Sequence, residues 1–250
     1  MLQTFRNAWK IVEIRKKILF TLFMILLYRV GNSIPVPYVN VTFLGQYFQQ
    51  LENTVLGLYN VMSGGAFSQA TIFALSIQPY INASIIIQLL CIAIPALERM
   101  SKDEGEEGKK KINNITRYST VGIALLQGFA YYMMLRNQTV SNPSAAILSD
   151  TGVWQAIVII LTFTAGSALV MWMGEQITEF GIGNGISMIL FASIISRFPT
   201  NIITSITNIS NGSLKWWAYL LMLLGALLLI VLIVVMEVME VVIAAFFNST

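Results

Sequence analysis

Apolar and polar positions alternate in long blocks along the chain and divide it into six apolar stretches. These stretches cover residues 18–34, 77–97, 118–135, 153–174, 183–195 and 216–236. A helix that crosses the core of a bilayer needs roughly 20 apolar residues. The pattern therefore predicts an all-α, polytopic membrane protein with six transmembrane helices. The fifth stretch is short and lies among glycines, so we expect it to be tilted or partly irregular.

The segment between the first two apolar stretches has an unusual composition. Pro35 and Pro37 end the first predicted helix, because neither residue can donate a backbone hydrogen bond. One amphipathic helix is then predicted at about Phe43–Val61, followed by a turn at Gly64 and Gly65. Such a segment could be a surface loop, or it could fold back into the membrane against a cavity.

The second apolar stretch carries polar side chains, including Gln78, Asn82 and Gln88. A polar group in hydrocarbon costs free energy unless a protein or water partner satisfies it. Irregular backbone at membrane depth is tolerated only where it is buried in protein or lines a wet cavity. The two features together predict the wall of a pore with a small loop folded beside it.

Composition supports a membrane location and excludes some chemistry. The chain is 56% hydrophobic and 11% charged, whereas a soluble domain has about 25% charged residues. It contains no histidine, which excludes histidine-based catalysis and histidine metal sites. Its one cysteine, Cys91, cannot form an internal disulfide and is expected to be a small buried hydrophobe. No cleavable signal peptide is predicted at the N-terminus.

Lysine and arginine predict the orientation in the membrane. Basic residues cluster in the amphipathic N-terminus, residues 1–17, and again after the second stretch, in 98–117. Residues 35–76 and 137–152 contain neither lysine nor arginine. The excess of these residues on the cytoplasmic side predicts a cytoplasmic N-terminus. The mixed charges of 98–117 fit a solvated loop or a docking surface for a cytoplasmic partner.

Four stretches carry a resemblance to a known family: residues 29–37 (RVGNSIPVP), 63–90, 104–112 (EGEEGKKKI) and 174–187 (GEQITEFGIGNGIS). Over about residues 5–240 the chain resembles the N-terminal half of SecY, the central subunit of the bacterial protein-conducting channel. The family fold has ten spans in two inverted halves that form a clamshell around a pore. The resemblance implies a SecY-like transmembrane part at 18–236, half of such a clamshell, and a divergent tail at 237–250.

The resemblance also implies a function. Such a subunit translocates unfolded secretory proteins and releases hydrophobic segments sideways into the lipid bilayer of the bacterial cytoplasmic membrane. It is not an enzyme and uses no cofactor or metal of its own. The implied partners are SecE-like and SecG-like small membrane subunits, SecA or the ribosome, and either a C-terminal half or a second copy of the chain. The family's basic loop after the sixth span is absent from the 237–250 tail, which weakens the expectation of SecA or ribosome docking.

Two other functions stay open at this point. The chain could be a truncated or designed half-channel that dimerises without conducting, or a small-solute transporter with broken helices. A transporter would be expected to carry charged or ion-coordinating groups at the pore, where this chain has aliphatic side chains.

By motif alignment the resemblance assigns three sets of site residues. The pore ring would be Ile77, Ile81, Ile186 and Leu190. The lateral gate would include Asn82, Gln88 and Gln127. A re-entrant plug before the second span would comprise Tyr59, Asn60, Val61, Met62, Ser63, Gly64, Gly65, Ala66, Phe67, Ser68, Gln69 and Ala70. Without the resemblance, the same residues fit ordinary helix packing, static hydrogen bonds between helices and an external loop.

Three residues depart from the usual family pattern. Gln69 and Phe180 stand where basic residues are usual, and Tyr38 stands where glycine is usual.

Overall fold

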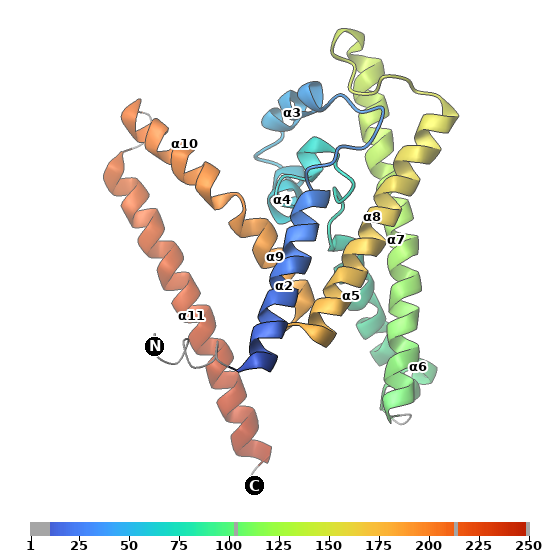
Figure 1. Cartoon of the computed structure of the whole chain (residues 1–250), viewed down its shortest axis with the longest axis vertical. Helices are drawn as coiled ribbons and strands as arrows, with labels where there is room; N and C mark the ends of the chain where they lie inside the picture. Colours follow the sequence, from blue (N-terminus) through green and yellow to red (C-terminus); the bar gives the residue numbers. More distant parts are fainter. Residues whose placement is uncertain (1–10, 103–104, 213–214, 249–250) are drawn as a thin grey trace. The chain divides into compact units, whose positions relative to one another are not determined.

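The computed structural model describes residues 11–102, 105–212 and 215–248, with side chains up to Met239 in the last helix (Figure 1). The described residues fall into two compact units, the first ending at Arg197 and the second beginning at Phe198, and each unit is described by itself. The first unit contains α2 (Val12–Gly31), α3 (Val41–Gln50), α4 (Val55–Met62), η1 (Phe67–Gln69), α5 (Gln78–Ala93), α6 (Pro95–Lys102), α7 (Gly105–Ser141), η2 (Pro143–Ala145), α8 (Val153–Phe180) and α9 (Gly185–Ile195). The second contains α10 (Phe198–Ser210) and α11 (Trp216–Asn248).

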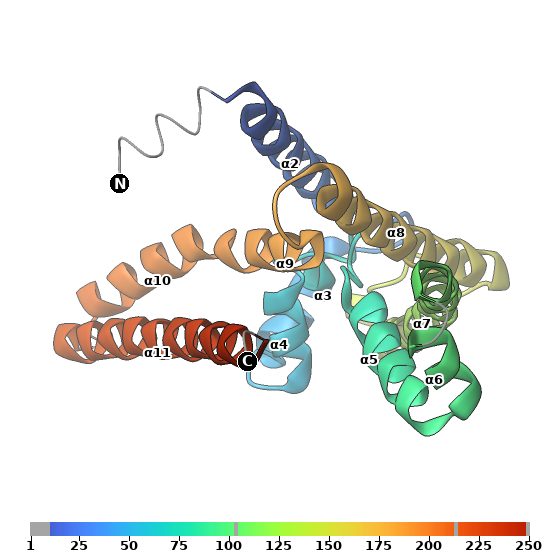
Figure 2. The same ribbon diagram turned by 90° about the horizontal axis from the view of Figure 1, so that it is seen from below.

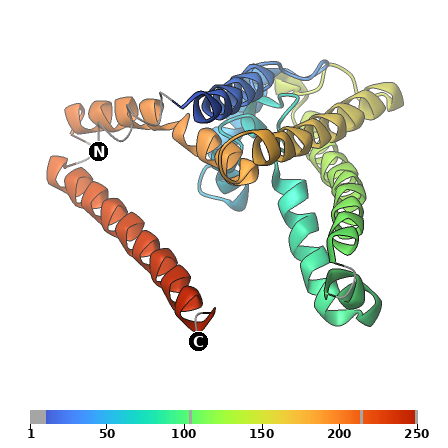
Figure 3. The same ribbon diagram turned by 60° about the horizontal axis from the view of Figure 1, so that its bottom comes forward.

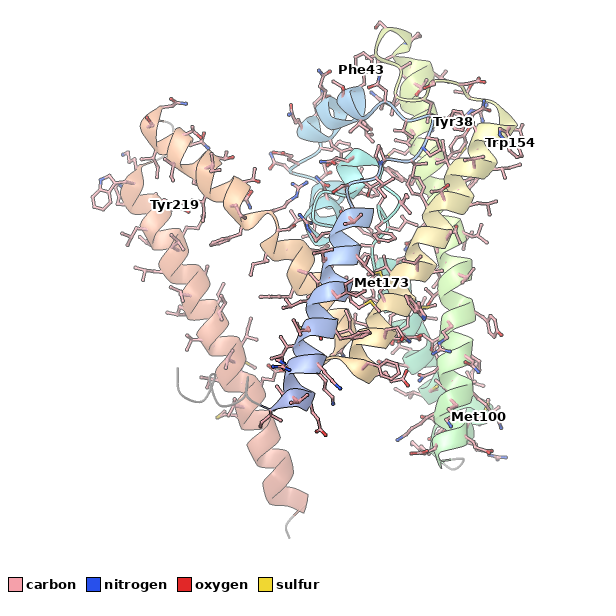
Figure 4. The ribbon with its side chains drawn as sticks, in the orientation of Figure 1. Tyr38, Phe43, Met100, Trp154, Met173 and Tyr219 are labelled. Atoms are coloured by element: carbon pink, nitrogen blue, oxygen red, sulfur yellow. The ribbon has the colours of Figure 1, made fainter. Side chains whose placement is uncertain are left out.

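The described residues confirm the all-α prediction. They form α-helices, two short 3-10 helices and two isolated β-bridges, Pro35–Thr71 and Val39–Leu148. Within the first unit, α7 packs against α5 and α8, and α8 also contacts α2 and α9 (Figure 2). Tyr38, Phe43 and Trp154 lie at one end of this unit and Met100 at the other (Figure 4). These ends are called the α3 end and the α6 end below.

The described helices support a multi-pass membrane protein. By length and composition, Val153–Phe180, Gly185–Ser210 and Trp216–Met239 could each cross a membrane. The bent pair α5 and α6 would make a fourth crossing if counted as one span. The helix α7 covers the third predicted span, and α2 covers the first, 18–34, only up to Gly31; neither meets the same criterion. The number of six spans therefore stays a prediction.

The second predicted span, 77–97, is wrong at its C-terminal end. The helix α5 stops at Ala93, and α6 leaves it at an angle of 103° (Figure 3). Ile94 between them is extended, with φ −109° and ψ 112°. The ring of Pro95 disfavours a helical conformation for the preceding residue, which explains the break.

The loop interpretation of 98–117 is also wrong for the described residues. Residues 98–102 belong to α6, and 105–117 form the start of the 37-residue helix α7. Residues 103 and 104 lie outside the described residues. Whether this region docks a partner stays a prediction.

The single amphipathic helix predicted at 43–61 is two helices. Asn40 caps α3, because its side-chain oxygen accepts hydrogen bonds from the backbone N–H groups of Thr42 and Phe43. The chain then turns before α4. A Cβ on Gly57 would lie 2.0 Å from the carbonyl oxygen of Glu52, so the turn folds back tightly onto α4.

Other differences from the sequence-based prediction are smaller. The helix α10 was not predicted, and α11 continues beyond the predicted 216–236 to Asn248, into the 237–250 tail. Cys91 is partly exposed rather than buried.

Two hydrophobic clusters form the core of the first unit. One lies toward the α3 end and includes Leu44, Phe67, Leu135 and Phe163. The other lies around α2, α8 and α9 and includes Met24, Tyr28 and Met173, the last labelled in Figure 4. The residues of the implied pore ring belong to this second cluster.

Candidate functional site

The implied pore ring, here called the aliphatic quartet (Ile77, Ile81, Ile186 and Leu190), gathers in one hydrophobic cluster. Ile77 is fully buried immediately before α5, and the other three are partly buried. Ile81 follows one turn later on α5, while Ile186 and Leu190 share one face of α9. The structure thus brings the four residues together, and their role as a pore ring stays a prediction.

Two glycines allow α8 and α9 to approach each other near this quartet. A Cβ on Gly185 would lie 2.0 Å from the carbonyl oxygen of Gly174, a distance that no real side chain could occupy. A Cβ on Gly174 would lie 3.3 Å from the Cδ1 atom of Ile77. Asn184 caps α9 by accepting hydrogen bonds from the backbone N–H groups of Ile186 and Ser187. These local features place the start of α9 beside Ile77.

A buried hydroxyl network lies beside the quartet. The Tyr28 hydroxyl is 3.0 Å from Ser76 Oγ and 2.8 Å from Ser193 Oγ. Ser167 Oγ donates to the carbonyl oxygen of Ser76 at 3.3 Å. The network joins α2, α8, α9 and the residue that precedes Ile77. Sequence reasoning missed it, because tyrosine and serine in apolar helices have no spacing that marks them as partners.

Ser76 has a conformation that few residues adopt. Its φ of +50° lies in the left-handed region, where residues other than glycine are uncommon. The two hydrogen bonds of the network at Ser76, one through Oγ and one through its carbonyl oxygen, help to hold this conformation. The network therefore fixes the backbone from which Ile77 projects.

The predicted plug, here called the 59–70 segment, is a folded structure at the α3 side of the unit. It contains the end of α4, the turn at Gly64 and Gly65, and η1. Asn60 organises it from within: its side-chain oxygen accepts from Ser68 N at 3.0 Å, and its carbonyl oxygen accepts from Gly65 N at 2.9 Å. Ser63 Oγ accepts from Phe67 N at 3.0 Å.

Phe67 anchors the 59–70 segment in an aromatic cluster. Its ring stacks on Tyr131 of α7 with centroids 4.4 Å apart and meets Phe48 of α3 edge-on at 5.2 Å. The Tyr131 hydroxyl also donates a hydrogen bond to the carbonyl oxygen of Phe67. Aromatic pairs are worth about 0.5–1.5 kcal/mol beyond the area they bury. This side of the segment is therefore firmly held, and its role as a plug stays a prediction.

The three implied gate residues do not meet at one place. Gln127 on α7 lines a cavity of about 220 Å³ together with Phe67 and Tyr131. Gln88 on α5 lines a different cavity, of about 300 Å³, together with Cys91. Asn82 is partly buried on α5 and lines neither. Their shared role as a lateral gate stays a prediction.

Gln127 is nevertheless unusual. Its side-chain oxygen is buried and has no hydrogen-bond partner among the residues that the structure describes. Gln88, in contrast, is exposed and donates to Ser84 Oγ at 3.4 Å. An unsatisfied buried acceptor costs free energy, which a polar partner from outside this set would recover.

An ion pair joins α7 and α8 near Ile186 of the quartet. Arg117 Nε donates to Glu175 Oε1 at 2.7 Å. The hydrogen bond that Arg117 donates to Glu175 raises the pKa of the guanidinium above its ordinary value, so this residue keeps its charge. Both residues line a cavity of about 340 Å³ that also touches Tyr80 and Ile186. The quartet therefore has a polar cavity beside it that charged groups line.

Comparison with known proteins identifies the family. A family model described as SecY matches residues 71–246.

The chain belongs to the SecY family.

Individual relatives agree with this assignment. The chain is 37% identical over 214 residues to the protein translocase subunit SecY of Aquifex aeolicus, covering 86% of this chain and 50% of that protein. It is 45% identical over 205 residues to the SecY subunit of Streptomyces scabiei, covering 80% of this chain and 47% of that protein. The chain thus spans about half the length of these SecY relatives.

Solved structures show the same fold. The chain is similar to Sec61 in the canine ribosome-channel complex from the endoplasmic reticulum, with a TM-score of 0.51 and 16% identity over 74% of this chain and 37% of that one. A structure described as that of a protein-conducting channel matches with the same TM-score and coverage. About three quarters of the chain therefore share the fold of these channel proteins.

Proposed function

We propose that this chain forms part of the wall of a protein-conducting channel. Unfolded secretory polypeptides would cross the membrane past the aliphatic quartet. Hydrophobic segments would leave sideways into lipid through a gate of which α5 and α7 form one side. The chain would do this without enzymatic activity and without a cofactor, in the bacterial cytoplasmic membrane and with its N-terminus in the cytoplasm.

The observation that carries the proposal is the convergence of Ile77, Ile81, Ile186 and Leu190 from two helices that are far apart in the sequence. Bulky aliphatic side chains repel water and ions, and a hydrophobic constriction can gate a pore by dewetting. The same side chains can move apart around a passing polypeptide because no hydrogen bond or charge holds them in place.

The surroundings of the quartet support a pore rather than a solute site. The polar residues near the quartet line an open cavity with Arg117 and Glu175, which suits an aqueous vestibule. We find no observation that favours a small-solute transporter.

The partners belong to the proposal as well. SecE-like and SecG-like small membrane subunits, a polypeptide that supplies further helices, or a second copy of the chain would complete the channel. SecA or the ribosome would drive transport from the cytoplasmic side.

Ion flux through vesicles that contain the full chain and its partner subunits tests the proposal. The double variant Ile81→Ser, Ile186→Ser places two hydroxyls in the quartet and should raise the resting flux of chloride several-fold over the unchanged channel. Ile86 on α5 is 46% exposed, lies on a different face of the helix from Ile81 and is outside the quartet. Ile86→Ser is therefore the matched control and should leave the flux unchanged.

A second measurement separates a pore from a leak caused by damage. Cysteine at position 81, in a Cys91→Ser background, should form a disulfide with a cysteine in a secretory precursor arrested during transport. Cysteine at position 86 should not. Cross-linking at position 81 that does not exceed that at position 86 would show that the moving chain does not pass the quartet specifically, and the proposed pore would be wrong.

A further inference from the structure

The turn of the 59–70 segment lies against the end of α9. Both of its glycines have positive φ, +66° at Gly64 and +94° at Gly65. A Cβ on Gly64 would lie 2.9 Å from the carbonyl oxygen of Ser193 and 3.1 Å from Ser196 Oγ. The turn therefore contacts the C-terminal end of α9 through its backbone, with no side chain in between.

Arg197 covers the second glycine. A Cβ on Gly65 would lie 2.6 Å from Arg197 Nη2, 3.2 Å from its Nε and 3.3 Å from its Cζ. Three atoms of the guanidinium group thus lie over the α-carbon of Gly65. Only glycine leaves room for this contact, and its positive φ is also one that other residues rarely adopt.

The position of Arg197 is electrostatically unusual. The residue is partly buried and lines a cavity of about 480 Å³ between α3, the 59–70 segment and the end of α9. Glu52 is the other charged residue in the lining, and its carboxylate attracts the guanidinium through space. Moving the charged guanidinium of Arg197 out of water costs free energy, so its position over Gly65 requires a compensating interaction.

The two sides of the 59–70 segment are held differently. On the α7 side, Phe67 is fixed by ring stacking and by the hydrogen bond from Tyr131. On the α9 side, the contacts are backbone to Ser193 and Ser196, together with the guanidinium of Arg197. Ser193 is itself fixed, because its hydroxyl belongs to the network with Tyr28. The side chain of Arg197 is therefore the adjustable part of this contact.

We propose that Arg197 is the positioning residue that keeps the 59–70 segment seated against the end of α9. Its guanidinium closes over Gly65, and Glu52 supplies the opposite charge. When Arg197 swings away, the turn loses its cover on the α9 side, while Phe67 keeps the segment tethered to α7. The inference rests on the proposed function, because the seated segment would close the channel from this side.

Thiol labelling tests this seating without measuring transport. Ala66 lies in the 59–70 segment and is 1% exposed, so a cysteine there should react with a maleimide only when the segment leaves its seat. In the full chain carrying Cys91→Ser and Ala66→Cys, purified in mild detergent, Arg197→Gln should speed labelling roughly 2- to 30-fold, the range for a residue that modulates such an equilibrium. Arg136→Gln is the matched control, because Arg136 is an exposed arginine on α7 that does not line the Arg197 cavity. It should leave the rate unchanged.

A second buried position separates local release from general loosening. Ala74 is fully buried in the same hydrophobic cluster as Phe67 but lies outside the 59–70 segment. Ala74→Cys should label equally slowly with and without Arg197→Gln. Faster labelling at both positions would mean that Arg197 only supports the fold, and no change at position 66 would also overturn the proposal.

Gly65 and Arg197 should act as one unit. Gly65→Ala displaces the guanidinium and should by itself speed labelling at position 66. Combined with Arg197→Gln, it should give less than the product of the two separate effects, because both changes remove the same contact. A labelling rate in the double variant equal to the product of the two separate effects would show that the residues act independently. The labelling outcome does not depend on ion flux, so failure of the channel proposal and failure of this one are distinguishable.

Discussion

The hydroxyl groups of Tyr28 and Ser193 lie 2.8 Å apart in the buried centre of the first unit, although 165 positions separate the two residues. Ser193 has a single hydroxyl hydrogen and directs it to the carbonyl oxygen of Ile189 at 2.9 Å. Tyr28 must therefore donate to Ser193, and Ser76 then donates to Tyr28. This directed chain links α2 to the helix that carries Ile186 and Leu190.

Removing the Tyr28 hydroxyl should destabilise the fold. Tyr28→Phe keeps the ring stacked on Phe73 but leaves the buried Ser76 and Ser193 hydroxyls without this partner. The expected cost is about 1–3 kcal/mol, seen as a lower midpoint of thermal unfolding in mild detergent. Tyr118→Phe is the control, since Tyr118 is 79% exposed. Equal midpoints for the two variants would contradict the role of the network.

Two glycine-to-alanine changes should shift the stability of the fold in opposite directions. A Cβ on Gly166 of α8 would lie 1.9 Å from the carbonyl oxygen of Ile72, so Gly166→Ala must push α8 away and should cost about 1–3 kcal/mol. Nothing lies within 4 Å of a Cβ on Gly122 of α7. Gly122→Ala should be neutral or stabilise by up to about 1 kcal/mol. Thermal unfolding measures both, and a loss of stability with Gly122→Ala alone would refute the argument.

Replacing Tyr38 by glycine should stabilise the chain. Tyr38 has a φ of +69°, a left-handed conformation that costs a residue with a Cβ about 1–2 kcal/mol. Glycine removes this cost and keeps the backbone hydrogen bond from Ser149 N to the carbonyl oxygen at position 38. We expect Tyr38→Gly to raise the unfolding midpoint. Tyr47→Gly, inside α3, should lower it, and a drop for both would show that the Tyr38 side chain matters more than its backbone.

The predicted orientation can be tested with single cysteines in a Cys91→Ser background. Asn53, Asn113 and Asn142 are all exposed, so each tolerates the change and can react. Cysteines at 53 and 142 should react with an impermeant thiol reagent added to intact cells. The cysteine at 113 should react only after the membrane is permeabilised. The reverse pattern would show that the lysine and arginine distribution was misinterpreted.

The sequence predicts the apolar helices well because a helix in lipid needs a long run of apolar residues, which is visible in the sequence itself. The stretches 153–174 and 216–236 fall inside α8 and α11, and the gathering of the aliphatic quartet agrees with the motif positions. The resemblance leads us to expect glycine at the position of Tyr38, and the left-handed φ found there gives a physical reason for that expectation.

Other features depend on contacts that no local pattern records. The break between α5 and α6 follows from Pro95. The predicted span 77–97 does not include this break, because the apolar run continues past Pro95. The partners of Tyr28 lie 48 and 165 positions away, so only the folded chain reveals them. The cover of Gly65 by Arg197 is similarly invisible in sequence, where the two residues are separate features.

The early end of α5 has a consequence for the surrounding lipid. Its 16 residues, at a rise of 1.5 Å each, span about 24 Å, whereas the hydrocarbon core of a bilayer is about 30 Å thick. Ile85, Ile86, Leu89 and Ile92 face outward on this helix. Where lipid contacts a helix this short, the bilayer would have to thin locally to avoid hydrophobic mismatch. The kink at Ile94 and Pro95 therefore sets how much of the hydrocarbon core α5 can span.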